Sequence, residues 1–134
     1  MKRVEATDPK SAQRLLERLN HGHDGSIRKL TIIKARRLRP SDGSLVYLCE
    51  GLEECDVELE LLLNSYEGAK RTQVVVLRFS QISQFQVVQK AKQDYSEIYS
   101  MEVGAAAAQT MHIIVCGGAD KSKVLELWCR TIHC

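Results

Sequence analysis

Alternating apolar and acidic residues make DVELELLLN, residues 56–64, the clearest pattern in the chain. Glu58 and Glu60 interrupt a row of large apolar side chains at every second position. A period of two is typical of an antiparallel strand with one buried side and one solvent-facing side. We therefore predict a strand whose glutamates point outward and whose opposite side points into a core. The inward set is Val57, Leu59, Leu61 and Leu63.

A different spacing predicts a helix over about residues 8–20. In TDPKSAQRLLERLN, the apolar side chains recur with the 3.6-residue period of one helix face. That face consists of Ala12, Leu15, Leu16 and Leu19. Thr7 or Asp8 can cap the first turn and Pro9 suits its first position, whereas Asn20 and Gly22 are stop signals. We expect an amphipathic helix that packs on the segments after it.

Beyond this helix, short apolar segments alternate with turn-forming residues. Residues 26–38, 45–49, 72–88 and 110–116 are rich in the branched and aromatic side chains that strands favour. Turns are predicted at residues 40–44 and 66–70, and the long segment 72–88 predicts two strands or one bent strand. The tail, residues 120–134, fits a helix face and a strand face equally well, so its structure stays open.

These elements predict an α+β fold that is mostly antiparallel β, a sandwich or open barrel with an N-terminal helix. The 134 residues suit a single domain, with a β-rich core over about residues 26–134. No apolar run reaches the roughly 18 residues needed to span a bilayer. The N-terminus also lacks the apolar stretch of a secretory signal. We expect a cytoplasmic protein that does not engage a membrane.

The segment NHGHDGS, residues 20–26, is the strongest candidate for chemistry. Two histidines and a carboxylate can bind one metal ion, so a metal-dependent hydrolase using His21, His23 and Asp24 is an alternative function. The following residues do not continue the metal-binding histidine patterns, and the five cysteines lack zinc-knuckle spacing. We expect no catalytic residue, metal or cofactor, and instead a structural turn at His23, Asp24 and Gly25. A role of the histidines beyond that turn stays open.

Charge is segregated along the chain, although the net charge is only +2. Residues 1–49 carry eleven Lys/Arg against five Asp/Glu, whereas residues 50–67 carry seven acids and no base. The basic stripe Arg28–Arg39 can follow phosphates, so a nucleic-acid-binding module is a second alternative. Aromatic side chains for base stacking are not interleaved with it, so we expect no nucleic-acid partner. Lys34 and Arg36 would instead pair across strands with the outward glutamates of residues 56–64.

The acidic segment EGLEECDVELE, residues 50–60, offers a face for a protein partner. Outward carboxylates can steer a basic partner, and they can equally be ordinary solubilising residues on a sheet. The candidate contacts are Glu50, Glu53, Glu54, Glu58 and Glu60.

The order of these signals resembles the immunity-protein 50 family and related small, β-rich, uncharacterised bacterial proteins. His23-Asp24 precedes a first strand with Ile27, a later strand carries Phe79, and the chain closes on a strand, a glycine turn and a terminal strand. Such proteins are thought to neutralise a cognate toxin by binding it. The resemblance implies a strand in the tail, a fold-determining turn at His23-Asp24 and a toxin as partner. We therefore expect a non-enzymatic protein-binding domain, an immunity-type inhibitor, with homo-oligomerisation left open.

Overall fold

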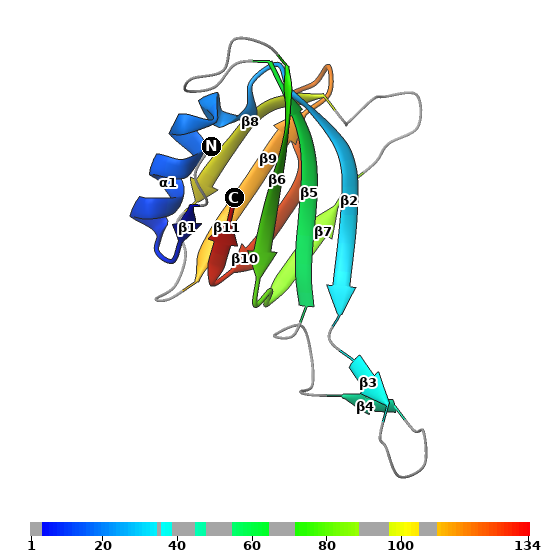
Figure 1. Cartoon of the computed structure of the whole chain (residues 1–134). Helices are drawn as coiled ribbons and strands as arrows, with labels where there is room; N and C mark the ends of the chain where they lie inside the picture. The colour runs from blue at the N-terminus through cyan, green and yellow to red at the C-terminus, as the bar shows by residue number, and fades with distance from the viewer. Residues whose placement is uncertain are drawn as a thin grey trace.

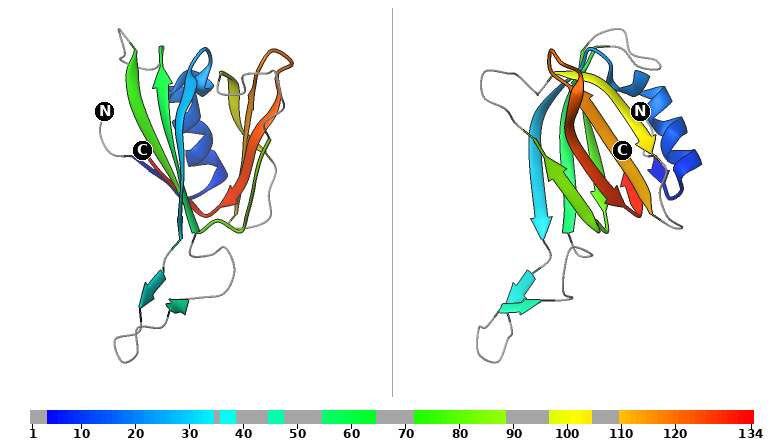
Figure 2. Two further views of the ribbon diagram at one scale, coloured as in Figure 1. Left: turned by 90° about the vertical axis from the view of Figure 1, so that its right-hand side faces the viewer. Right: turned by 180° about the vertical axis from the view of Figure 1, so that it is seen from behind.

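Two antiparallel sheets face each other in the computed structural model, and a helix lies along one side of the pair (Figures 1 and 2). The structure describes residues 4–34, 36–38, 45–47, 55–64, 72–88, 97–104 and 110–134. The strand order is β1-β11-β6-β5-β2 in one sheet and β7-β10-β9-β8 in the other. The predicted α+β fold with mostly antiparallel strands is confirmed, and the two separate sheets make it a sandwich.

The strand bounds show which parts of the chain build each sheet. The five-stranded sheet consists of β1 (Glu5–Ala6), β2 (Ser26–Lys34), β5 (Cys55–Leu63), β6 (Gln73–Ser80) and β11 (Thr131–His133). The four-stranded sheet consists of β7 (Gln84–Val87), β8 (Ile98–Gly104), β9 (Met111–Gly117) and β10 (Ser122–Cys129). Strands β3 (Arg36–Leu38) and β4 (Leu45–Tyr47) pair with each other as a separate ribbon, which Figure 1 shows beyond the ends of β2 and β5.

Strand β5 lies between β2 and β6 and has the predicted alternation. Its inward side chains are at most 1% exposed, whereas Glu58 and Glu60 are partly exposed on the other side. Phe79 of β6 pairs in register with Val57 and with Ile132 of β11, and all three are 0% exposed. The core therefore lies between the sheets. The described elements leave the outer face of the five-stranded sheet uncovered (Figure 1).

Helix α1 (Pro9–Arg18) closes one side of the sandwich and packs against β1, β8 and β9 (Figure 2). Its cap is Asp8: the carboxylate accepts the Ser11 N–H at 2.7 Å, and this bond lowers the pKa of Asp8. The predicted apolar face is buried. The helix ends earlier than predicted, at Arg18, because Asn20–Gly22 form a 3-10 turn, η1. No helix among the described residues has the length and apolar character to cross a bilayer.

Segments that the sequence left open are strands. Residues 72–88 form β6 and β7, with a turn at residues 81–83 between them. The tail forms β10 and β11 rather than a helix. Residues 26–38 are divided between β2 and β3, which belong to different sheets. The turns predicted at residues 40–44 and 66–70 lie outside the described residues.

Four of the cysteines are described, and none of these four is in a disulfide bond. Cys55 and Cys129 are buried, and Cys116 and Cys134 are half-buried. Burial raises the pKa of Cys129 to about 12, so this thiol stays protonated and unreactive at neutral pH.

Candidate functional site

His21 and His23 contact the backbone of the edge strand β8. His21 Nδ1 lies 3.2 Å from the carbonyl oxygen of Met101, and His23 Nδ1 lies 2.9 Å from that of Tyr99. A carbonyl oxygen only accepts hydrogen bonds, so each Nδ1 carries the proton and donates. His23 Nε2 lies 3.6 Å from Asp24 Oδ2, across an exposed pair of side chains. The two histidines therefore hold the turn between η1 and β2 against β8.

The backbone of the same turn also pairs with β8. The N–H of Asp24 donates to the Ile98 carbonyl at 3.2 Å, and the N–H of Ile98 donates to the Gly25 carbonyl at 2.8 Å. Residues 20–22 and Asp24 have positive φ values between 53° and 68°, which are costly for residues other than glycine. Residues 20–25 thus cover part of the free edge of β8, where unpaired backbone groups would otherwise face solvent.

Among the residues that the structure describes, the hydrolase alternative has no preformed metal centre. Within the described residues, no three His, Cys, Asp or Glu side chains are grouped so that they could hold a metal ion. His21, His23 and Asp24 are among the residues described, and the two imidazoles are directed to separate carbonyls of β8.

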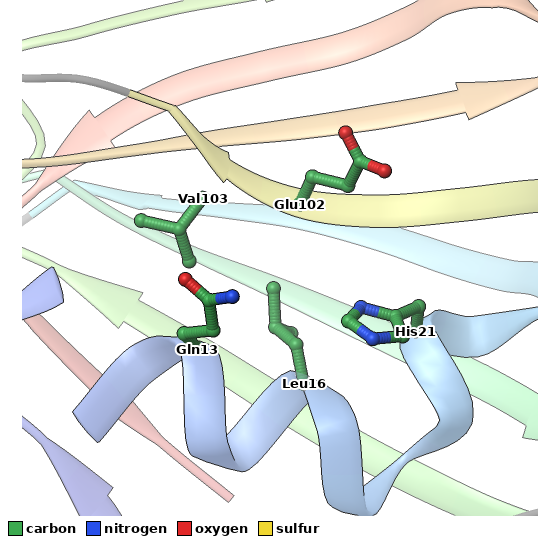
Figure 3. A pocket seen from close by; sticks show the side chains of 5 residues that line it. All are labelled: Gln13, Leu16, His21, Glu102 and Val103. Atoms are coloured by element: carbon green, nitrogen blue, oxygen red, sulfur yellow. The ribbon is translucent and has the colours of Figure 1, made fainter. Parts of the chain in front are cut away.

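A small pocket lies beside the histidine turn, between α1 and β8 (Figure 3). Its volume is about 200 Å³, and its lining residues are Gln13, Leu16, His21, Glu102 and Val103. Leu16 is buried and Val103 is partly buried, whereas Gln13 and Glu102 are exposed. Of these residues, sequence reasoning singled out His21 as a candidate site residue. Gln13 and Glu102 come from distant parts of the chain and share no motif that could have pointed to them.

Arginines pair with the outward carboxylates of β5. Arg78 lies 2.7 Å from Asp56 and 3.3 Å from Glu58, measured between guanidinium nitrogens and carboxylate oxygens. The hydrogen bond to Asp56 raises the pKa of Arg78. On the neighbouring strand, Arg28 Nε lies 3.4 Å from Glu60 Oε2. The candidate contacts Glu58 and Glu60 are therefore partly neutralised within the chain.

These arginines are not the partners that the sequence predicted for the glutamates. The register places Arg78 opposite Glu58 on β6, and it places Lys34 opposite Cys55 at the end of β2. Arg36 belongs to β3, in the separate ribbon. The remaining candidate contacts lie outside the described residues; they are Glu50, Glu53 and Glu54.

The basic stripe Arg28–Arg39 does not form one continuous strand. Arg28 and Lys29 are exposed on β2, whereas Arg36 and Arg37 lie in β3, which belongs to another sheet. The described residues therefore do not present the stripe as a single cationic row along one strand, the arrangement that favoured a nucleic-acid backbone.

Exposed apolar side chains lie beside the paired charges of the five-stranded sheet. Val74 is 48% exposed and Val76 is 43% exposed. They lie on β6 opposite Leu62 and Glu60 of β5, so their side chains point to the same outer face of the sheet as that of Glu60. Val75, between them, is 6% exposed and points into the core. Sequence reasoning missed this patch, because a continuous apolar run such as VVVL indicates a fully buried strand.

The outer face of the four-stranded sheet carries a second polar cluster. The rings of His112 and Trp128 stack with centroids 4.1 Å apart and planes 7° from parallel. His112 Nε2 lies 3.0 Å from Glu126 Oε2, and Lys123 Nζ reaches the same oxygen at 3.4 Å. Gly104 makes room for the imidazole, since a Cβ there would lie 2.8 Å from His112 Nδ1. The cluster thus holds one carboxylate between two cationic or hydrogen-bonding groups.

We expect Glu126→Gln to flatten the acid side of the stability profile. The hydrogen bond with His112 lowers the pKa of Glu126 from its ordinary value of 4.5, so the ionised carboxylate stabilises the fold above that pH. This stabilisation is lost as the pH falls through the lowered pKa, and the glutamine variant has none to lose. Urea unfolding between about pH 7 and about pH 3 measures the difference. Glu5→Gln, at an exposed site on β1, is the control, and equal acid slopes for wild type and Glu126→Gln would contradict the prediction.

Comparison with models of known protein families, with curated proteins and with solved structures finds no significant match to this chain. The family resemblance drawn from the sequence therefore stays a prediction, and so does the toxin partner that it implies. A function is therefore inferred from the surfaces of the residues that the structure describes.

Proposed function

We propose that this chain is a non-enzymatic protein-binding domain that contacts its partner through the outer face of the five-stranded sheet. The observation that carries the proposal is the exposure of Val74 and Val76 on β6, the central strand of that sheet. Full burial of one valine side chain contributes roughly 1.5–3 kcal/mol. A partner that covers both half-exposed valines therefore gains a substantial part of its binding free energy.

Charged side chains of both signs lie on the β5 side of the two valines and beside them on β6. Asp56, Glu58 and Glu60 lie along β5, with Arg78 beside them on β6 and Arg28 on β2. An apolar centre inside a polar rim is the usual anatomy of a protein interface. Because the carboxylates are already paired, we assign affinity to the apolar contact and specificity to the charges. The partner that fits is a protein with an apolar contact surface and charges of both signs beside it.

The finer identity of the partner follows from the sequence resemblance alone. We propose a cognate toxin as the partner and a bacterial cytoplasm as the place where the complex forms. In this proposal Glu58 and Glu60 are rim contacts beside the valines, held in place by Arg78 and Arg28.

We expect Val76→Arg to weaken partner binding by at least about tenfold, because truncating or blocking a central apolar contact typically removes the largest single contribution. The matched control is Gln84→Arg, which adds the same side chain at an exposed site on β7 of the other sheet. The immobilised wild-type chain is incubated with lysate of the source organism, and the retained protein is identified by mass spectrometry. Its dissociation constant is then measured for the three forms.

The proposal requires that the control binds like wild type and that Val76→Arg does not. Thermal unfolding of all three forms shows whether each is folded. Equal affinity of wild type and Val76→Arg would rule the surface out, and a lysate that yields no retained protein would count against protein binding altogether.

A further inference from the structure

We propose that the free edge of β2 accepts an extended, acidic segment of another protein as an added strand of the five-stranded sheet. This inference goes beyond the proposed function, because it concerns backbone pairing at the edge of the sheet rather than apolar contact on its outer face. Strand β2 is the last in the order of its sheet, so one of its edges has no neighbouring strand among the described residues.

Of the four strands at the edges of the two described sheets, β2 has the longest open edge. Strand β1 has two residues and β7 has four, and the edge of β8 is partly covered by residues 20–25. Strand β2 has nine residues and lies on the side of the sandwich opposite α1 (Figures 1 and 2). Every second residue of an edge strand directs its N–H and C=O away from its one neighbour, so a further strand can pair with these groups.

The first residue of β2 shows that this edge accepts an antiparallel neighbour. Ser26 pairs with Leu62 of β5 on one side and forms an isolated bridge with Glu97 on the other. Beyond Ser26, β5 is the one described strand that pairs with β2. A segment that pairs from Ile27 onward therefore extends the sheet by one strand, which is a common way for a protein to bind an extended peptide.

The charges of the open edge select an acidic segment. Arg28 and Lys29 are exposed, and β2 contains three Lys or Arg residues and no acid. Arg28 pairs with Glu60 at 3.4 Å, whereas no ion pair among the described residues engages Lys29. Carboxylates of an added strand therefore gain a cross-strand attraction at Lys29. A second copy of β2 would bring only further positive charge, and like charges on neighbouring strands oppose pairing.

The inner side of the same edge adds an apolar requirement. Leu30 and Ile32 lie opposite Leu59 and Val57, which are both 0% exposed, so all four side chains point to the inside of the sandwich. Ile32 is nevertheless 54% exposed, because no described strand lies beyond β2. A segment that alternates apolar and acidic residues covers Ile32 and also meets Lys29. Strand β5 has this alternation and pairs with the other edge of β2.

Titration of the ¹⁵N-labelled chain with a blocked peptide of alternating glutamate and valine, about six residues long, tests this proposal. At about 0.15 M salt, which screens distant charges, we expect saturable amide shifts along β2. The matched peptide of alternating lysine and valine should bind at least about fivefold more weakly, because each attraction becomes a repulsion.

Reversal of one charge on β2 should change this preference. Lys29→Glu should weaken binding of the glutamate peptide at least about threefold and strengthen binding of the lysine peptide. Lys10→Glu makes the same charge change at an exposed site on α1, and it should leave both affinities unchanged. Thermal unfolding shows whether each variant is folded, and the comparison of the two peptides on the wild-type chain depends on no variant.

Hydrogen exchange distinguishes strand addition from loose electrostatic attraction. Amides of β2 that exchange rapidly in the free chain should exchange slowly with the glutamate peptide bound, because carbonyl groups of the added strand accept their hydrogens. Ile32→Ser should weaken binding of this peptide at least about threefold, because an apolar contact is lost.

Equal affinity of the two peptides, unchanged binding by Lys29→Glu, no saturable shift, or binding without new protection in β2 would each overturn the proposal. Dimers of the free chain that Ile32→Ser abolishes, measured by sedimentation, would also overturn it and assign the edge to a second copy. A failure at β2 leaves the Val76→Arg experiment untouched, so the two proposals fail separately.

Discussion

Replacing Phe79 by alanine is expected to lower the free energy of unfolding by about 3–5 kcal/mol. Phe79 is 0% exposed and is the largest fully buried side chain among the described residues. It lies on the central strand β6 between Val57 of β5 and Ile132 of β11. Both neighbouring strands are held in register with β6, so they cannot move in to fill the cavity that the removal of the ring leaves. A small domain has only about 5–15 kcal/mol of stability, so this change removes a large part of it.

The other phenylalanine of the chain provides the matched control. Phe85 is partly buried on β7, an edge strand of four residues, so it packs against fewer neighbours. We expect Phe85→Ala to cost clearly less, about 1–2 kcal/mol. Denaturant unfolding followed by circular dichroism compares the variants, with Phe79→Leu as a milder substitution if Phe79→Ala does not fold. Equal losses for Phe79→Ala and Phe85→Ala would show that the core is not centred on β6.

The second large effect is expected from Gly25→Ala, with a loss of about 3 kcal/mol. A Cβ at this position would lie 2.6 Å from Leu63 Cδ2, 2.8 Å from the Leu62 carbonyl oxygen and 2.9 Å from the Gly22 carbonyl oxygen. Two of these atoms belong to the backbone, so the turn must move rather than a flexible side chain. Movement of the turn breaks the 2.8 Å hydrogen bond from the Ile98 N–H to the Gly25 carbonyl.

Two measurements check this prediction. Denaturant unfolding gives the loss of stability, and hydrogen exchange of the Ile98 amide reports on the turn itself. The amide is expected to exchange faster in Gly25→Ala than in wild type. Asp24→Gly is the control, because Asp24 is exposed and its φ of 62° suits glycine, so stability should change by less than about 1 kcal/mol. Unchanged stability and unchanged Ile98 exchange in Gly25→Ala would contradict the close packing.

Local sequence patterns were sufficient to predict a helix or strand where the residues that determine it lie within that same segment. The alternation at residues 57–63 predicted β5 and its buried side correctly, because one face of that strand is apolar throughout. Asp8, Pro9 and the leucine spacing predicted α1, because the cap and the apolar face lie within one segment. The tail could not be resolved in this way. Its leucines fit either period, and pairing of β10 with both β9 and β7 decided for a strand.

The candidate sites depended on distant residues and could be predicted only in part. His21 and His23 stood out in the sequence, but the carbonyls of Met101 and Tyr99 that they contact are some eighty positions away. Glu58 was predicted to face outward, but its partner Arg78 was not foreseen. The pocket at Glu102 has no sequence signal, since it forms where separate elements meet. The patch at Val76 was missed because the apolar run on β6 indicates a fully buried strand.

The sequence by itself determined the class of the fold, the position of the N-terminal helix and the inward side of β5, because these follow from local periodicity and capping. Only the tertiary structure decided the strand order, the partners of the charged residues and the contacts of the histidine turn. The physical reason is strand register. A shift of one residue in pairing turns every side chain of a strand to the opposite face, and long-range packing selects that register.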